Sequence, residues 1–406
     1  MIPKRLDDII TDLRKQTWVE NLLISGNLYL VGGCVRDAYR DKDIKDIDII
    51  VEKLSIGQIK HLLFPYGNVR LVGESFAVIK FNPDRLFGEP YDISVPRIDR
   101  KIGEGHKGFA VDTKGVSLYK DLERRDFTIN SIAINIESGE VIDPYNGIQD
   151  IEWRVLRATN KDAFIEDPLR ILRGIQFSAR FGYKIDIPTM RLMQENSYLI
   201  RSISGERIME EFMKIINKNG NTQIALDLLY KTGTDIALFE KKMLQYDKGF
   251  EYLDAISFFY LLGILGDVDP SKFVLDRLKG ECNLAKEIRT LNQLLERLPH
   301  VEHDREDFLY MLSKSFSEAP AVMEAVILPD SVSEVVSDMR LGKIPFSMKS
   351  VQVNGDDVIK FSAGSLKDKE VGIMLERVLR DALMNRFNWK KRNDSTDYLV
   401  SLIYGK

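Results

Sequence analysis

The stretch LYLVGGCVRD (28–37), followed closely by DIKDIDIIV (43–51), decides how this chain is expected to fold. A short apolar strand runs into the pair Gly32-Gly33, and a helix is expected to begin just after them. Glycines let a backbone approach a ligand, and the start of a helix offers free N–H groups, so this element favours a bound phosphate. Arg36 adds a cation in the first turn of that helix.

Two carboxylates, Asp46 and Asp48, stand one residue apart at the start of the second apolar strand. Side chains at positions i and i+2 of a strand face the same way, and paired carboxylates bind hard divalent cations such as Mg²⁺. Two such ions activate an attacking hydroxyl and stabilise a leaving pyrophosphate. An Asp-x-Asp pair alone is more often a solvated strand start, but the glycine pair upstream favours the metal site.

A second segment, LERRDFTINSIAINI (122–136), places charged residues before a predicted strand over 128–136. Arginine forks suit triphosphate oxygens, and a carboxylate suits ribose hydroxyls, which makes Arg125 and Asp126 candidate contacts. The alternative is an ordinary charged surface, because Arg-Arg-Asp is a common surface sequence.

A third segment, IEDPLRILRGIQFSARFGY (165–183), predicts an amphipathic helix with Asp167 as its N-cap. Asp167, Arg170 and Arg173 are spaced by three and lie along one face. An acid accepts from an exocyclic amine, and an arginine donates to a ring nitrogen or carbonyl. Cytosine and adenine carry an amine beside an acceptor, whereas uracil and guanine do not match. The alternative is a charged face with no ligand.

Composition narrows the class of protein. The chain has 406 residues, 44% hydrophobic and 30% charged, as expected of a soluble protein of several domains. Its net charge of −4 excludes a protein that simply coats nucleic acid with basic residues. Two cysteines, and no apolar run near the roughly 18–20 residues that span a bilayer, predict a cytoplasmic location without a membrane.

These segments together resemble a known family. The motifs of class II CCA-adding tRNA nucleotidyltransferases and bacterial poly(A) polymerases occur here in the same order: Gly32-Gly33, Asp46 with Asp48, RRDFTIN (124–130), DPYNGIQD (143–150) and EDPLRILR (166–173). RKIGEGHKGF (100–109) is similar to a loop of the bacterial CCA-adding group, and GERIMEEFMKII (205–216) resembles the following helix. The resemblance covers about residues 28–218.

The resemblance implies roles for single residues. Asp46 and Asp48 are implied as catalytic residues and as ligands of two Mg²⁺ ions. The implied nucleotide-binding residues are Gly32, Gly33, Arg36, Arg125, Asp126, Asp167, Arg170 and Arg173. Whether Asp92 is a third carboxylate stays open. Gln176 stands where some members carry another arginine, which puts a fourth arginine contact in doubt.

The implied fold is α+β. A nucleotidyltransferase-type mixed β-sheet head with helices is expected over 28–155, after an N-terminal helix over 1–27. An all-helical remainder is expected to form a neck (156–222), a body (223–340) and a tail (341–406).

The implied function is template-independent addition of CCA to tRNA 3′ ends, with CTP and ATP as substrates and release of pyrophosphate. The expected partners are tRNA lacking a complete CCA end, CTP and ATP; neither a membrane nor a protein partner is implied. Two alternatives remain within the family: a poly(A) polymerase, or an enzyme adding only CC or only A. An alternative of another class is a non-catalytic tRNA-binding protein.

Other stretches carry weaker signals. In NRFNWKKRN (385–393) aromatic and basic residues alternate, as in surfaces that bind RNA, although a solvated helix end has the same composition. The candidate contacts there are Arg386, Lys390, Lys391 and Arg392. Gly103–Gly108 matches a dinucleotide-binding pattern, but a glycine-rich loop near the active site is the better interpretation. The pair His303-Asp304 is interpreted as surface, not as part of a metal site.

Overall fold

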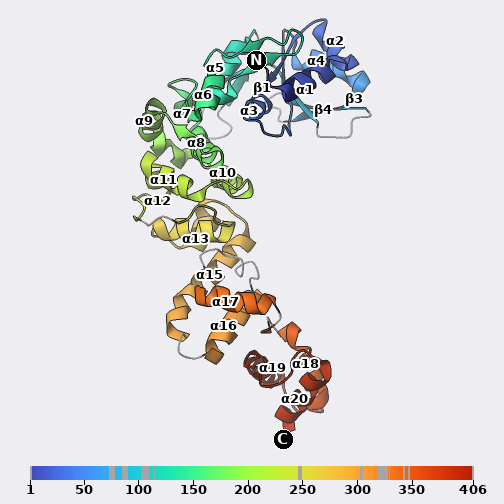
Figure 1. The fold of residues 1–406 in the computed structure, drawn as a ribbon, viewed down its shortest axis with the longest axis vertical. Helices are drawn as coiled ribbons and strands as arrows, with labels where there is room; N and C mark the ends of the chain where they lie inside the picture. Colours follow the sequence, from blue (N-terminus) through green and yellow to red (C-terminus); the bar gives the residue numbers. More distant parts are fainter. Residues whose placement is uncertain are drawn as a thin grey trace. The chain divides into compact units, whose positions relative to one another are not determined.

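The computed structural model describes residues 2–72, 78–84, 90–101, 109–113, 115–245, 249–301, 305–318, 328, 330–341, 343–345 and 348–404. The chain divides into two compact units, Met1–Met243 and Leu244–Lys406 (Figure 1). This boundary falls inside the predicted helical body, and the division into head, neck, body and tail stays a prediction. The glycine-rich loop and His303-Asp304 lie outside the described residues.

The first unit is built on a mixed sheet of seven strands, in the order β3-β4-β5-β2-β1-β8-β9. The strands are β1 (Asn27–Val31), β2 (Asp48–Glu52), β3 (Gly67–Val72), β4 (Val78–Pro83), β5 (Tyr91–Ser94), β8 (Ala133–Asn135) and β9 (Val141–Ile142). Neighbouring strands run antiparallel except β2 and β5, which are parallel and place Asp48 opposite Asp92. Two further ladders pair β6 (Ile98–Lys101) with β7 (Phe109–Asp112), and β10 (Val155–Leu156) with β11 (Lys184–Ile185).

Helices pack on the sheet because it has apolar side chains on both faces. Successive side chains of a strand point to opposite faces of the sheet. On one face Tyr29 and Val31 of β1 pack with Leu118 and Leu122 of α5 (Leu118–Glu123). The other helices of this part are α1 (Lys4–Arg14), α2 (Thr17–Leu23), α3 (Gly33–Tyr39), α4 (Ile56–Leu63) and α6 (Gly147–Trp153). The helix expected after the glycine pair is α3. Ser55 and Gln58 form a capping box that starts α4.

The predicted N-terminal helix over 1–27 is two helices. Gln16 adopts an extended conformation between α1 and α2, and the chain turns there. The turn has a packing reason, because Leu6 and Ile10 of α1 and Trp18 and Leu22 of α2 are all buried. One straight helix could not bring both apolar faces to the same core.

The strand predicted over 128–136 is shorter than expected. Residues Thr128–Asn130 form a 3₁₀ turn, and only β8 continues as strand. The turn packs closely against α6, since a Cβ on Gly147 would lie 2.1 Å from the Thr128 carbonyl oxygen. Because Asn130 lies in this turn and not in a strand, its side chain reaches Asp126.

The remainder of the first unit is helical, as expected, except for the short β10–β11 ladder, whose β11 interrupts the neck predicted to be all-helical over 156–222. Its helices are α7 (Ala163–Glu166), α8 (Leu169–Phe181), α9 (Ile187–Asn196), α10 (Gly205–Asn217), α11 (Thr222–Thr232) and α12 (Thr234–Phe239). Phe127 joins this part to the sheet by packing against Phe164 and Phe177, at ring-centroid distances of 6.3 and 5.9 Å. Gly174 leaves room for the Phe127 ring, whose Cζ would lie 2.9 Å from a Cβ there.

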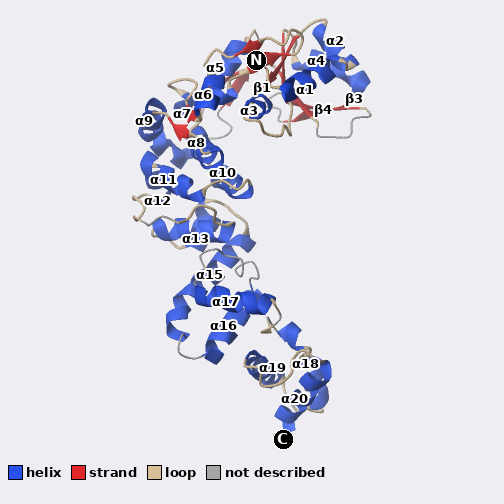
Figure 2. Ribbon diagram, in the orientation of Figure 1, coloured by secondary structure: helices blue, strands red, loops and turns tan. Residues whose placement is uncertain are grey.

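The second unit is helical throughout its described residues, and the strands all lie in the first unit (Figure 2). Its helices are α13 (Ala255–Leu265), α14 (Pro270–Lys272), α15 (Cys282–Val301), α16 (Arg305–Glu318), α17 (Asp330–Arg340), α18 (Gly355–Phe361), α19 (Asp368–Leu383) and α20 (Arg392–Tyr404). Phe258 and Phe259 of α13 are among its fully buried side chains. Within the described ranges, no helix is both long and apolar enough to cross a bilayer. The α+β fold with an all-helical second part is therefore confirmed.

Candidate active site

A cavity of about 590 Å³ in the first unit collects most of the predicted site residues, and we call it the first cavity. Its lining includes seven arginines: Arg36, Arg97, Arg124, Arg125, Arg170, Arg173 and Arg207. Four aspartates also line it: Asp48, Asp92, Asp126 and Asp167. Cations outnumber carboxylates along this wall, which favours an anionic ligand with several charges.

Gly32 forms the turn between β1 and α3 and has a φ of 72°. A Cβ at this position would lie 2.9 Å from Arg125 Nη1 and 3.5 Å from Asp48 Oδ2. Both the backbone conformation and the close approach of these two side chains therefore require glycine. The turn therefore lies close to both the Arg125 guanidinium and the Asp48 carboxylate.

The carboxylates Asp48 and Asp92 lie on neighbouring parallel strands and are register partners. Burial raises the pKa of Asp48 above its ordinary value; Arg125 opposes this rise, and the Asp92 and Asp46 carboxylates add to it. Lys80 holds Asp92 by an ion pair of 2.9 Å. Asp46 precedes β2, is exposed, and lines a neighbouring cavity together with Asp48.

A buried carboxylate, Asp121 of α5, holds two of the cavity arginines. Its Oδ2 accepts from Arg125 Nη2 at 3.0 Å, and its Oδ1 accepts from Arg124 Nε at 3.0 Å. Burial alone would raise the pKa of Asp121, but the guanidinium groups of Arg125 and Arg124 outweigh burial and hold it below its usual range. Arg125 Nη1 also donates to the Asn130 carbonyl at 3.1 Å, so its fork is fixed at the cavity wall.

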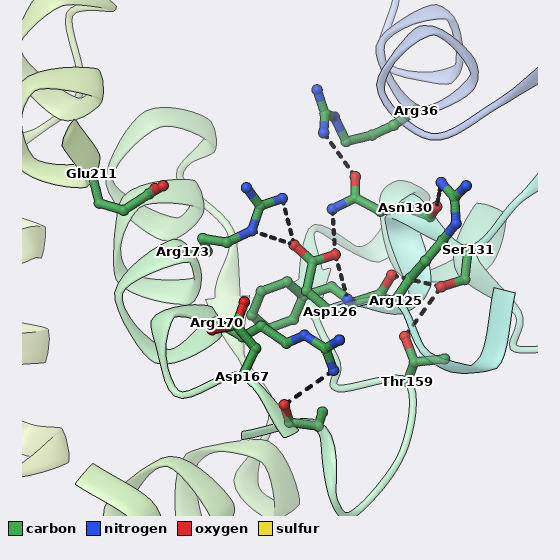
Figure 3. A network of polar contacts seen from close by, with 12 residues as sticks. Arg36, Arg125, Asp126, Asn130, Ser131, Thr159, Asp167, Arg170, Arg173 and Glu211 are labelled. Carbon is green, nitrogen blue, oxygen red and sulfur yellow. Dashed lines mark hydrogen bonds and ion pairs between the residues drawn. The ribbon is translucent and has the colours of Figure 1, made fainter. Parts of the chain in front are cut away.

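A polar network joins α3 to α8 (Figure 3). Arg36 Nη1 donates to Asn130 Oδ1 at 2.7 Å, and Asn130 Nδ2 donates to Asp126 Oδ1 at 2.8 Å. Arg173 pairs with Asp126 Oδ2 at 2.7 Å. Burial alone would raise the pKa of Asp126, but Arg173 and Asn130 outweigh burial and hold it below its usual range. The carboxylate therefore stays charged while its side chain is only 7% exposed.

The far end of the first cavity is formed by Asp167 and two arginines. Asp167 lies two residues before α8, whose N-cap is Pro168 and not Asp167 as the sequence predicts, and its Oδ1 accepts from the Leu169 N–H at 3.2 Å. Arg207 of α10 approaches Asp167 Oδ2 with its Nη2 at 3.3 Å. The buried Arg170 donates to the Ala163 carbonyl at 3.0 Å and also to the Arg124 carbonyl.

Two family models and several known proteins are similar to parts of this chain. The family model "Poly A polymerase head domain" matches residues 28–157, and "Probable RNA and SrmB-binding site of polymerase A" matches 182–239. A "Multifunctional CCA protein" of Stenotrophomonas maltophilia is 41% identical over 195 residues, which cover 47% of this chain and 45% of that protein. Over about half of its length the chain is therefore similar to poly(A) polymerase domains and to CCA proteins. It matches about half the length of this relative.

Solved structures of CCA-adding enzymes have the same fold over nearly the whole chain. The Bacillus stearothermophilus enzyme in complex with CTP has a TM-score of 0.68 and 21% identity, and 96% of each chain is covered. The Thermotoga maritima enzyme complexed with tRNA has a TM-score of 0.69 and 24% identity, and covers 99% of this chain and 96% of that one. The likeness shows that the second unit, like the first, has the fold of these structures.

Most of the residues that the family resemblance implies come together. Nine line the first cavity: Gly32, Gly33, Arg36, Asp48, Arg125, Asp126, Asp167, Arg170 and Arg173. Asp46 lies beside them in the neighbouring cavity. The roles assigned to these residues remain predictions, because their positions alone do not identify a ligand.

The basic and aromatic candidates of the C-terminal segment lie in the second unit. Arg386 pairs with Asp381 and with Glu306, and Arg392 pairs with Asp357. Trp389 is buried. Two of the four proposed RNA contacts therefore stabilise this unit by ion pairs.

Lys390 and Lys391 are exposed in the same segment. Lys390 lies 5.4 Å from the centroid of the Trp389 ring. RNA contact by these residues stays a prediction.

Sequence reasoning missed Asp121, Asn130 and Arg207. Asp121 stands three and four residues before Arg124 and Arg125, a helical spacing for ion pairs that could have identified it. Asn130 lies within the quoted RRDFTIN motif but was given no role. Arg207 lies 40 residues after Asp167, so its contact depends on how α10 packs against α8.

Replacing Arg173 by Gln should destabilise the chain by about 3–5 kcal/mol at pH 7, because it leaves the buried Asp126 without its cation. A carboxylate whose pKa is lower in the folded state than in the unfolded chain stabilises the fold above the unfolded pKa of about 3.9. This stabilisation is lost as the pH falls through the folded pKa. The deficit of R173Q should therefore shrink toward pH 3. Urea titrations at both pH values, with the exposed Arg191→Gln as control, measure it. An equal deficit at both pH values would contradict the buried ion pair.

Proposed function

We propose that this chain is a CCA-adding tRNA nucleotidyltransferase. The terminal ribose hydroxyl of a tRNA attacks the α-phosphate of CTP or ATP, a new phosphodiester bond forms, and pyrophosphate leaves. The observation that carries the proposal is the first cavity itself. Its lining contains seven arginines together with the Asp48 carboxylate, which lies beside the Gly32 turn. Such a lining suits a triphosphate whose α-phosphate lies at Asp48.

The phosphates are held by the backbone and by fixed guanidinium groups. Gly32 lets the ligand approach the turn, and Arg36 and Arg125 face the cavity from either side of it. Both arginines are already fixed by the chain, Arg36 by Asn130 and Arg125 by Asp121. Preorganised donors lose little conformational entropy when the ligand binds, which favours tight binding of the triphosphate.

The ribose and base are held farther along the first cavity. Asp126 is the residue that the family resemblance implies for the ribose. Its Oδ1 already accepts from the Phe127 N–H and Asn130, and its Oδ2 is held by two nitrogens of Arg173, so a ribose hydroxyl has to replace one of these donors. Asp167 accepts from the exocyclic amine of cytosine or adenine, and an arginine donates to the neighbouring ring acceptor. Arg170 is the donor that the family resemblance implies, and its present contacts with two carbonyls also position the start of α8.

The residues fit a bound Mg²⁺, which Asp46 and Asp48 would hold. Mg²⁺ is usually bound by one or two carboxylates together with substrate phosphates. Among the described residues no cluster of three or more His, Cys, Asp or Glu is suited to a metal, so the fit rests on a carboxylate pair that phosphates complete. When bound, two such ions supply activation of the attacking hydroxyl and neutralise the leaving pyrophosphate.

The relatives support this substrate class. Solved relatives are complexes of CCA-adding enzymes with CTP, with ATP and with tRNA. A protein that processes tRNA from CTP and ATP belongs where these molecules are abundant, so a cytoplasmic location is part of the proposal. Both Cys34 and Cys282 are free thiols, in agreement with a reducing compartment.

A tRNA transcript that ends before CCA, incubated with CTP, ATP or both, should receive C, C and then A. Sequencing of its 3′ ends measures the product. Asp48→Asn should lower incorporation by at least about 100-fold, because it removes one carboxylate from the reacting centre. Asp8→Asn, an exposed carboxylate of α1, is the control and should leave incorporation unchanged.

Each alternative product would identify one of the alternative functions. A long A tail would identify a poly(A) polymerase, and arrest after CC with ATP present would identify a CC-adding enzyme. Addition of A only to a tRNA that already ends in CC would identify an A-adding enzyme. Retained tRNA binding without any incorporation by the unmodified chain would identify a non-catalytic binding protein.

Asp167→Asn should relax the choice of base. Its amide can donate to the O4 of uracil, so the ratio of kcat/KM for CTP over UTP should fall roughly tenfold or more, since one such contact is worth about 1–3 kcal/mol. Steady-state kinetics with each nucleotide measures the ratio, and the exposed Asp162→Asn is the matched control. An unchanged ratio would remove Asp167 from base recognition.

A further inference from the structure

A second cavity of about 410 Å³ adjoins the first one. The two cavities share Gly33, Arg36 and Asp48, so Asp48 lies where they meet. Asp46 lines the second cavity but not the first. The carboxylate pair is therefore accessible from two directions.

Six cationic and four acidic side chains line the second cavity, so cations are in excess there. Its lining includes Arg36, Arg40, Lys42, Lys45, Arg180 and Lys218. Three of these groups surround one ring: the guanidinium carbons of Arg40, Arg36 and Arg180 lie 3.6, 5.1 and 5.1 Å from the centroid of Phe181. Cations crowded onto one ring repel one another unless an anion is bound among them.

The carboxylates of this cavity neutralise the three guanidinium groups unequally. Asp37 pairs with Arg36 at 2.8 Å and with Arg40 at 3.0 Å. Arg180 is bound instead by a neutral group, because the carboxamide oxygen of Gln176, when turned toward it, accepts from its Nη1 at 2.6 Å. Burial lowers the pKa of Arg180 to about 10, and repulsion by Arg36 and Arg40 adds to this, against attraction by Asp37 and Glu211.

Gln176 is the position at which this chain departs from members that carry another arginine. An arginine there would offer Arg180 no acceptor and would add a fourth cation to the cluster. The glutamine therefore fixes the direction of Arg180 without neutralising it. The guanidinium that results is oriented by the chain and still has the charge to bind an anion.

The chemistry of the proposed function indicates which anion reaches this place. In nucleotidyl transfer the attacking and leaving oxygens are roughly in line across the α-phosphate. If the triphosphate occupies the first cavity, the attacking strand has to reach Asp48 from another direction. Among the described cavities, the second one borders Asp48 and carries the cations that a nucleic-acid backbone requires.

We propose that the second cavity binds the 3′-terminal phosphodiester of the RNA that receives the nucleotide, and that Arg180, held by Gln176, contacts that phosphate. The inference rests on the proposed function, and it assigns the acceptor end of the RNA to residues of α3 and α8. Lys42, Lys45 and Lys218 provide further positive charge around the strand.

The test measures RNA binding without turnover. Fluorescence anisotropy of a tRNA transcript that ends before CCA gives its Kd at several salt concentrations for the full chain, Arg180→Gln and the exposed control Arg191→Gln. R180Q should weaken binding about 5- to 20-fold, and the slope of log K against log salt should fall by about 0.7, as expected for one lost phosphate contact. Arg180→Lys, which keeps the charge, should retain most of the slope. R191Q should bind like the unmodified chain.

A chemical change in the RNA separates a phosphate contact from a folding defect. Replacing the last phosphodiester by a neutral methylphosphonate should weaken binding to the unmodified chain, but should not weaken binding to R180Q further. CTP affinity, measured by titration calorimetry, should stay within about twofold in R180Q, since Arg180 does not line the first cavity. Equal losses from the methylphosphonate in both proteins, or a loss of CTP affinity matching the RNA loss, would overturn the proposal.

Failure of this inference differs from failure of the proposed function. If the unmodified chain completes CCA while R180Q binds RNA normally, the assignment of the second cavity is wrong and the function stands. If the chain binds the transcript through Arg180 but incorporates nothing, the phosphate site stands and the catalytic proposal fails.

Discussion

The buried carboxylate of Asp126 is the constraint on which the site depends. A charge at this depth is stable only if cations and donors compensate it, and Arg173 and Asn130 do so at 2.7 and 2.8 Å. Asn130 is held in turn by Arg36. One carboxylate thereby connects α3, the 3₁₀ turn and α8, which are far apart in the sequence. The Gly32 end and the α8 end of the first cavity are fixed relative to each other through it.

Packing around this network explains why the connection is rigid. The Phe127 ring follows Asp126 directly and fits against Gly174, where a Cβ would lie 2.9 Å from it. Gly147 lets α6 pack against the Thr128 carbonyl from the other side. Under the proposed function, the chain selects a base without a nucleic-acid template and has to keep its own side chains in register with the phosphates. Close packing of this kind meets that requirement better than a loop does.

Local patterns could predict much of this protein, and tertiary contacts explain the rest. The strand before Gly32, the helix after Gly33 and the helix of Arg173 follow from apolar spacing and from glycine. The turn over 128–130 could not be predicted, because Asn130 leaves the strand pattern to reach Asp126 and Arg36. The contact of Arg207 likewise depends on how two helices pack. Composition could not decide the roles of Arg386 and Arg392, since ion-paired and RNA-binding arginines have the same sequence signature.

The central claim is that the two ends of the first cavity act as one unit through Asp126. A double-mutant cycle with Arg36→Gln and Arg173→Gln, in which calorimetry measures CTP binding to the full chain, tests it most directly. Residues in one hydrogen-bonded network couple by about 0.5–3 kcal/mol, and the account predicts a coupling of at least about 1 kcal/mol. Losses of CTP affinity that add within about 0.3–0.5 kcal/mol would contradict it.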